Sequence, residues 1–298
     1  MVLSAIRSTP PISWLPFIGI SERAPVVAVL RLNGVIATGS KFRSGLSLAS
    51  LAPQIERAFS MQRVSAIALV INSPGGSPAQ SALICDRIRA LAKEKKKPVY
   101  AFTEDVAASG GYWLACAADE IYANENSIIG SIGVIYGGFG FHEALAKLGI
   151  ERRLYTAGDK KSVLDPFSPE KELDVKRLKS LQKELHENFK ELVRARRGDR
   201  LKGNARALFS GEFWTGPNAV DLGLIDGIGD VRSVMRAKFG DKVELRLLMR
   251  RQGLLSMFRR DEMNRRTPFE LSSSLGQNLA EGLLAAAEER FLWNRYGL

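Results

Sequence analysis

The feature that most limits the fold is a series of continuous apolar segments separated by segments with helical spacing. The apolar segments are 26–32, 66–71 and 98–102. Each predicts a buried strand, and 66–71, which is apolar throughout, predicts one that is covered on both faces, as in a parallel sheet. The helical spacing between them predicts right-handed crossover helices outside the sheet. We therefore expect an α/β fold with a twisted parallel sheet and flanking helices.

Further elements are expected downstream of these three strands. We predict strands at 120–123 and 151–157, and helices at 141–148, 169–197, 216–222 and 231–239. Ser168 followed by Pro169 is a typical start for the long helix, with serine as the cap and proline in the first turn. The glycines of 127–140 predict tight turns rather than a long helix.

Changes in composition divide the chain into three parts. The regular α/β pattern covers 25–240, which we predict to be one catalytic domain. An N-terminal arm of residues 1–24 precedes it, and a basic, partly helical extension of residues 241–298 follows. Within that extension, residues 242–266 hold eight Lys and Arg against three Asp and Glu. Such a segment is typical of attachment to a membrane, but it is equally compatible with an oligomer contact or with a solvated chain end.

The net charge of +11 favours an anionic partner. Peripheral contact with an anionic membrane is one partner that fits. Nucleic acid is not expected, because the basic residues are scattered and no stripe of interleaved aromatic residues accompanies them. The sequence contains no apolar run of 18 residues and no pattern typical of a signal peptide. We therefore expect a cytoplasmic protein, free or peripheral to the membrane, with Cys85 and Cys116 in the core rather than in a disulfide.

One small-residue turn is the strongest candidate for chemistry. Residues 106–117, VAASGGYWLACA, follow a predicted strand and begin a predicted buried helix. Such a turn places backbone N–H groups at a helix N-terminus, where they stabilise negative charge. Ser109 is then a candidate nucleophile, and the N–H of Gly110 a candidate oxyanion donor. The alternative is that Ser109 only caps the helix.

A serine nucleophile needs a base, and the histidines are poor candidates. His142 has no carboxylate partner nearby in the sequence, and His186 lies in a charged helix where exposure is expected. A lysine can act as the base when burial in an apolar cleft disfavours its charged form. Lys161, in a loop with apolar residues close behind it, meets this condition best. Lys160 is its competitor, and spacing alone does not separate the two.

Five motifs, taken in order, resemble one enzyme family. They are NSPGG (72–76), AASGGYW (107–113), GSIGV (130–134), GDKKSVLDP (158–166) and AVDLGLID (219–226). As an ordered set across most of the chain, they are similar to the S49 serine peptidases, the signal peptide peptidase A family. That resemblance implies a fold like that of ClpP and the crotonases.

The resemblance also implies a Ser/Lys dyad. Ser109 falls on the family's nucleophile in the SGGY turn. The family's general base lies three residues after a glycine and five before a proline, and Gly158 and Pro166 therefore select Lys161 over Lys160.

Three further residues match the family's motifs. Ser131 falls on the serine that holds the lysine amine towards the nucleophile. Gly110 and, by similarity, Gly76 would supply the oxyanion N–H groups. The resemblance thus implies an endopeptidase that cleaves extended, rather apolar peptides through an acyl-enzyme, with neither metal nor cofactor.

We expect neither an N-terminal membrane anchor nor a second catalytic unit, and in both respects the sequence would depart from typical members. Short members of the family assemble into rings, so a homo-oligomer is expected. Lys161 would then serve Ser109 of its own subunit or of a neighbour, and both alternatives stay open.

Two other functions fit part of the pattern. A crotonase-like acyl-CoA enzyme shares the parallel sheet and the NSPGG-type loop, and it would bind CoA without needing Lys161. A catalytically idle scaffold on membranes would use the basic extension and the apolar N-terminal arm.

Overall fold

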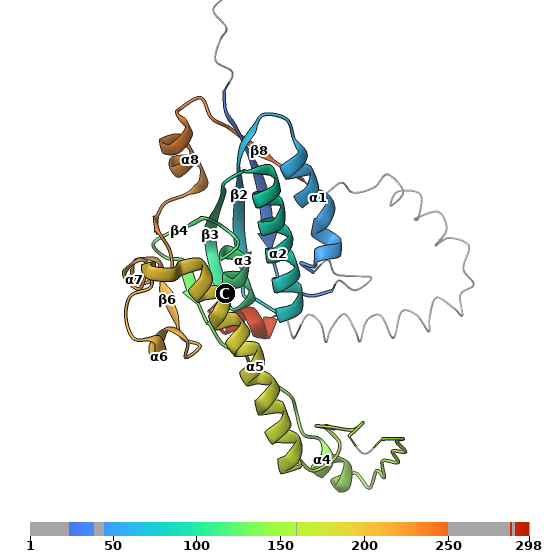
Figure 1. The fold of residues 1–298 in the computed structure, drawn as a ribbon. Coiled ribbons are helices and arrows are strands. Elements are labelled where there is room, and N and C mark those ends of the chain that lie inside the picture. The colour runs from blue at the N-terminus through green and yellow to red at the C-terminus, as the bar shows by residue number, and fades with distance from the viewer. Residues whose placement is uncertain (1–23, 39–44, 159, 250–286, 288–289, 298) are drawn as a thin grey trace, which may run out of the picture.

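The computed structural model describes residues 24–38, 45–158, 160–249, 287 and 290–297. Within them, eight strands form one sheet in the order β6-β5-β3-β2-β1-β8, with β4 and β7 branching from β3 (Figure 1). The strands are β1 (Val26–Asn33), β2 (Val64–Ser73), β3 (Val99–Ala108), β4 (Glu120–Ala123), β5 (Ile128–Gly130), β6 (Phe213–Thr215), β7 (Gly227–Ile228) and β8 (Glu244–Leu247). All the pairings are parallel except that of β5 with β6.

Helices cover both faces of this sheet. The helices of the described residues are α1 (Leu48–Ser60), α2 (Pro78–Lys95), α3 (Gly110–Ala115), α4 (His142–Lys147), α5 (Glu172–Arg197), α6 (Ala205–Leu208), α7 (Gly216–Asp221) and α8 (Val231–Phe239). The side chains of α1, α2 and α3 pack into the larger core cluster on one face, and those of α8 pack into a second cluster on the other. The expected α/β class, a largely parallel sheet with flanking helices, is confirmed.

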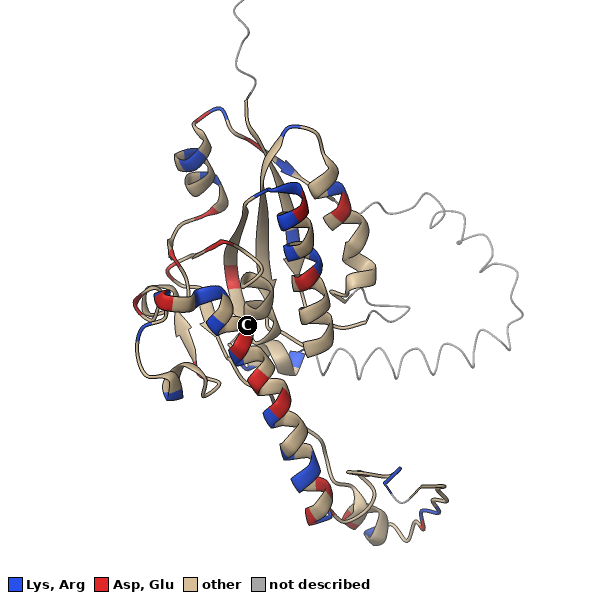
Figure 2. Ribbon diagram, viewed as in Figure 1, with Lys and Arg blue, Asp and Glu red and all other residues tan. Residues whose placement is uncertain are grey.

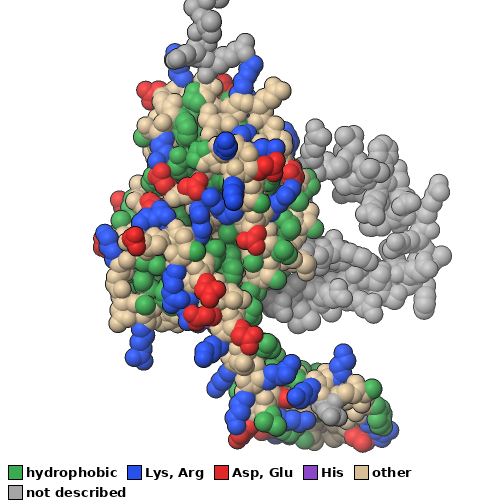
Figure 3. All heavy atoms as spheres, in the orientation of Figure 1, with side chains coloured by type: hydrophobic (Ala, Val, Ile, Leu, Met, Phe, Trp, Pro, Cys, Tyr) green, Lys and Arg blue, Asp and Glu red, His purple; other side chains and the backbone are tan. Residues whose placement is uncertain are grey.

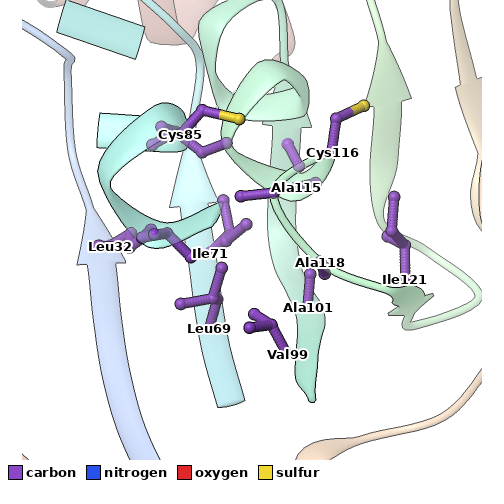
Figure 4. Close-up of a cluster of buried hydrophobic side chains, with 14 of the residues drawn as sticks. Leu32, Leu69, Ile71, Cys85, Val99, Ala101, Ala115, Cys116, Ala118 and Ile121 are labelled. Atoms are coloured by element: carbon purple, nitrogen blue, oxygen red, sulfur yellow. The ribbon is translucent and has the colours of Figure 1, made fainter. Parts of the chain in front are cut away.

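Alternation along the strands builds the two core clusters. In β1, Ala28, Leu30 and Leu32 face the helices α1 and α2, whereas Val27 and Val29 face α8. Both faces of the strand are therefore buried over residues 26–30, which explains why this part of its sequence is apolar, whereas Arg31 and Asn33 near its end are exposed. Figure 4 shows part of the larger cluster, with Cys85 and Cys116 among its side chains. Both cysteines are free, and burial raises the pKa of each thiol to about 12.

The sheet forks at β3, and the fork positions the candidate nucleophile. Residues 100–103 of β3 pair with β4, whereas residues 106–108 pair with β5. Ser109 follows directly at the carboxyl end of β3. Since ligands of parallel sheets bind beyond the carboxyl ends of strands, Ser109 occupies a favourable position for chemistry.

A long arm projects from the body of the molecule. It consists of α4, the chain around it and the first half of α5 (Figure 1). The second half of α5 is anchored to the body, where Phe189 stacks on Trp113 with ring centroids 4.8 Å apart and Val193 is fully buried. Charged residues occur along much of the length of α5 (Figure 2).

Two predictions for the arm were wrong. Residues 151–157 form no strand, because no strand among the described residues pairs with them, and Leu154 and Tyr155 are exposed. The helix α5 begins at Glu172 after Lys171, not at Ser168 and Pro169. The Ser168 hydroxyl instead donates to the Asp165 carboxylate in a preceding turn.

A buried ion pair ties the end of α5 to the chain before β7. The Arg197 guanidinium, 2% exposed, donates two hydrogen bonds to the Asp226 carboxylate at 2.7 and 3.0 Å, and the Ile121 N–H donates a third at 2.7 Å. Burial alone would raise the pKa of Asp226. The hydrogen bonds from Arg197 and Ile121 outweigh it and hold that pKa below its ordinary value.

We expect Asp226→Asn to lower the free energy of unfolding by about 3 kcal/mol at neutral pH, because Arg197 then stays buried without its counter-charge. A carboxyl whose pKa is lower in the folded state stabilises above its ordinary pKa, and this contribution is lost as pH falls through the lowered value. In urea titrations, the difference between wild type and variant should shrink below about pH 4. An equal difference at neutral and acid pH would contradict this prediction.

Part of the predicted C-terminal extension belongs to the sheet. β8 pairs in parallel with β1 and lies at its edge. Nearly all of the predicted N-terminal arm, and the extension from 250 to 286, lie outside the described residues. None of the helices in the described part of the chain is long and apolar enough to cross a membrane.

Candidate active site

Ser109 occupies a strained turn between β3 and α3. Its backbone has φ 51° and ψ −121°, a conformation that residues with a Cβ rarely adopt, and its N–H donates to the Gly130 carbonyl at 2.8 Å. The side chain makes no capping hydrogen bond to α3, although the residue is at the cap position. The hydroxyl is therefore not engaged as the cap of α3, contrary to the alternative that Ser109 only caps the helix.

The glycines after Ser109 allow the first turn of α3 to pack closely against Ser73 and Ser81. A Cβ at Gly111 would lie 2.3 Å from the Ser73 carbonyl oxygen, and one at Gly110 would lie 2.5 Å from the Ser81 hydroxyl. Gly110 is the first residue of α3, so its N–H has no partner within the helix. That N–H is next to the Ser109 hydroxyl in the chain and is available to an oxyanion.

The loop after β2 lies directly against Ser109. A Cβ at Gly75 would lie 2.8 Å from the Ser109 Cβ and 2.9 Å from the Gly110 nitrogen. Gly76 forms a parallel bridge with Ile36, in which the Ile36 N–H donates to Gly75 and the Ser77 N–H donates to Ile36. Because the residues beside Gly76 make these bonds, the N–H of Gly76 itself points away from Ile36.

We expect Gly75→Ala to slow any reaction at Ser109 by at least about tenfold, because the added methyl displaces the Ser109 turn and small misplacements are costly in catalysis. Gly75 also has φ +107°, which alanine adopts only with strain. Labelling of Ser109 by a fluorophosphonate, together with the melting temperature, would measure both effects. Gly137→Ala is the control, since a Cβ there meets open space. Equal labelling rates in the two variants would contradict the prediction.

Ser131 lines a cavity together with Pro74 and Gly76 of the loop after β2 and is 2% exposed. Its backbone is also in the left-handed region, with φ 52°, and its N–H donates to the Glu212 carbonyl at 2.6 Å. Ser109, Ser131 and Gly76 line the same cavity of about 310 Å³. The fold therefore brings together these three predicted site residues from three separate loops, and Gly110 adjoins Ser109.

Lys161 is not part of this cavity within one subunit. It is exposed, as is Lys160, and both lie in the arm between α4 and α5. At 1.5 Å per residue, α5 carries the chain about 25 Å from Phe189, where it meets the body, to its start at Glu172. A single subunit therefore gives Lys161 no buried pocket beside Ser109.

The sequence patterns did not point to one wall of the cavity. Leu292, Arg295 and Tyr296 line it from the C-terminal end of the chain. Tyr296 is buried against Val106 and Ala108, and its ring meets that of Phe213 edge-on at 5.3 Å. Nothing in the local pattern of 290–297 reveals a contact with residues so distant in the sequence.

The histidines differ in their surroundings. His186 was expected to be exposed, but it is half-buried and its Nε2 lies 3.1 Å from the Ile132 carbonyl oxygen. His142 lies at the start of α4 in the arm. Among the described residues, no group of three or more His, Cys, Asp and Glu side chains is arranged to hold a metal ion.

Comparison with known proteins decides the family. The family model described as "Peptidase family S49" matches residues 91–244, more than half of the chain. The chain belongs to peptidase family S49. This confirms the resemblance inferred from the five motifs.

Two curated relatives are similar to most of this chain. The chain is 50% identical over 273 residues to a Brucella abortus protein named "Na(+)/H(+) antiporter NhaA", which covers 91% of this chain and 37% of that protein. It is 32% identical over 210 residues to a "Putative signal peptide peptidase SppA" of Enterococcus faecium, covering 68% of this chain and 60% of that protein. The S49 chain thus spans less than two thirds of the length of either relative.

A solved structure of a mutant of the "1510-N membrane-bound stomatin-specific protease" is also similar to this S49 chain. The match has a TM-score of 0.46 at 16% identity and covers 76% of this chain and 98% of the other.

Proposed function

We propose that this chain is a serine endopeptidase in which Ser109 is the nucleophile. The observation that supports this most is the meeting of a strained, uncapped Ser109 with Ser131 and Gly76 in one cavity of an S49 family member. A serine held in such a turn presents its hydroxyl to a substrate without first having to leave a helix cap.

In the proposed reaction, the Ser109 oxygen attacks the carbonyl carbon of the scissile peptide bond while its proton passes to the neutral amine of Lys161. The N–H groups of Gly110 and Gly76 stabilise the resulting oxyanion. Lys161 then protonates the leaving amine, and the C–N bond breaks to leave an acyl-enzyme on Ser109. Lys161 next takes a proton from water, which attacks the ester carbonyl carbon. Lys161 then returns this proton to the Ser109 oxygen as the ester C–O bond breaks, which releases the acid and free Ser109.

The position of Lys161 favours a site completed between subunits. We propose that the arm of one subunit carries Lys161 to the Ser109 cavity of its neighbour, where Ser131 holds the amine and the contact excludes water. Burial of this kind disfavours the ammonium form, as a lysine base requires.

The surface of the arm supports such an assembly. Several of its large apolar side chains are exposed in the single chain, with Tyr155 at 89%, Phe139 at 81%, Leu173 at 77% and Leu148 at 71%. Apolar side chains are visible on the surface of the arm in Figure 3. Exposed apolar surface of this extent is typical of an interaction site. A ring of copies of this chain would cover it.

Substrates of this site would be extended and rather apolar peptides. Val134, Ile135, Leu292 and Tyr296 contribute apolar surface to the cavity beside Ser109. Remnants of signal peptides have this chemistry. Contact with an anionic membrane and a cytoplasmic location remain predictions of the sequence, since most of the basic extension lies outside the described residues.

A fluorophosphonate probe tests the proposed function. Mass spectrometry of the labelled protein should place the adduct on Ser109, and an excess of an apolar peptide substrate should slow the labelling. An adduct on another serine, or none, would contradict the proposal. A rise in melting temperature with acyl-CoA but not with peptide would instead favour the crotonase-like alternative.

A further inference from the structure

One polar side chain near the cavity has no part in the proposed reaction. The Nε2 of His186, on α5, lies 3.1 Å from the carbonyl oxygen of Ile132, and the histidine is half-buried. A carbonyl oxygen only accepts hydrogen bonds, so Nε2 carries the proton and donates it. This bond joins residues 54 positions apart in the sequence.

The bond lies where the chain enters and leaves the arm. Ile132 directly follows Ser131, and the next two residues, Gly133 and Val134, line the Ser109 cavity before the chain passes into the arm. On the return path, His186 lies one turn before Phe189, the residue through which α5 packs on Trp113. His186 therefore links the outgoing chain to the anchored part of the returning helix.

Few other bonds hold this segment of the cavity wall. The strand β5 ends at Gly130, whose carbonyl accepts from the Ser109 N–H, and the Ser131 N–H donates to Glu212. Within the described part of the chain, the Ile132 carbonyl accepts one hydrogen bond, which comes from His186. The Ile132 side chain is fully buried in the larger core cluster, so its peptide group lies where an unpaired carbonyl is costly.

We propose that His186 is a positioning residue for the peptidase reaction. Its hydrogen bond fixes residues 132–134, which sets the cavity wall and the direction of the Ser131 side chain. The same bond sets the angle at which the arm leaves the body, and with it the delivery of Lys161 to a neighbour. The inference rests on the proposed function, but it concerns a bond whose presence is measurable without activity.

The test compares two substitutions of His186. In His186→Gln, the amide nitrogen reaches about as far as Nε2 and donates the same bond, whereas His186→Leu has no donor. Asn188→Leu is the matched control, since it places leucine at an exposed position two residues further along α5. Each variant is measured for peptide hydrolysis, for the rate of fluorophosphonate labelling, and for hydrogen exchange of the amides of residues 131–134.

We expect His186→Leu to lower kcat and the labelling rate by about tenfold, because a misplaced catalytic group slows the chemical step. Amide exchange in 131–134 should become faster in the same variant. In His186→Gln, kcat and the labelling rate should stay within about threefold of the wild-type values, because the side-chain amide still donates a hydrogen bond to the Ile132 carbonyl. Asn188→Leu should match wild type in all three measurements.

Two results would overturn the inference. Unchanged exchange of 131–134 in His186→Leu would show that the bond does not fix the wall, whatever the activity. Equal slowing in His186→Gln and His186→Leu would show that the donor is not what matters. Failure of the proposed function gives a different result, since wild type itself would then neither hydrolyse peptide nor label at Ser109.

Discussion

Ser109→Ala should reduce peptide hydrolysis by about a millionfold, the loss typical of removing a serine nucleophile. The fold should hardly change, because the Ser109 side chain makes no capping hydrogen bond and alanine tolerates the strained φ no worse than serine does. The free energy of unfolding should therefore stay within about 0.5 kcal/mol of wild type. Hydrolysis of a quenched fluorescent apolar peptide and urea denaturation measure the two quantities.

Ser180→Ala is the control for this substitution, since Ser180 is exposed on α5. It should leave both quantities unchanged. Turnover by Ser109→Ala near the wild-type rate would remove Ser109 from the reaction.

Lys161→Ala should lower hydrolysis by about 10⁴-fold, the upper range for loss of a general base. The assembly should persist, because a single exposed lysine contributes little to an apolar interface. Steady-state kinetics and analytical ultracentrifugation measure the two effects. Lys160→Ala is the matched control, one residue away and also exposed, and it should retain activity. The reverse result, with Lys160→Ala inactive and Lys161→Ala active, would assign the base to Lys160.

The sequence predicted the strands β1 to β4, because burial of a strand makes its segment largely apolar. It did not predict the short strands β5 to β8. The limits of β4 and α8 agree with the segments 120–123 and 231–239. In both elements, the apolar residues that mark the element in the sequence are also the residues that pack in the core. The strand predicted at 151–157 failed because a strand needs a partner, and the arm provides none.

The predicted site residues also divide into those that the sheet positions and one that it does not. Ser109, Ser131 and Gly76 each follow a strand, so the topology of a parallel sheet brings their loops to one end. Lys161 lies in the arm, away from the ends of these strands, and its role in the reaction is a proposal that requires a second subunit. His186 was misjudged because the charges along α5 conceal the buried stripe of Phe189 and Val193, which starts one turn later.

Mixing the two inactive variants tests the central claim most directly. Ser109→Ala and Lys161→Ala subunits are dissociated, combined in equal amounts and reassembled, with exchange confirmed by native mass spectrometry. If the arm of one subunit completes the cavity of the next, about a quarter of the sites in a random ring regain both groups, and hydrolysis returns to about that fraction of wild type. Mixed rings that remain as inactive as either variant alone would contradict the account.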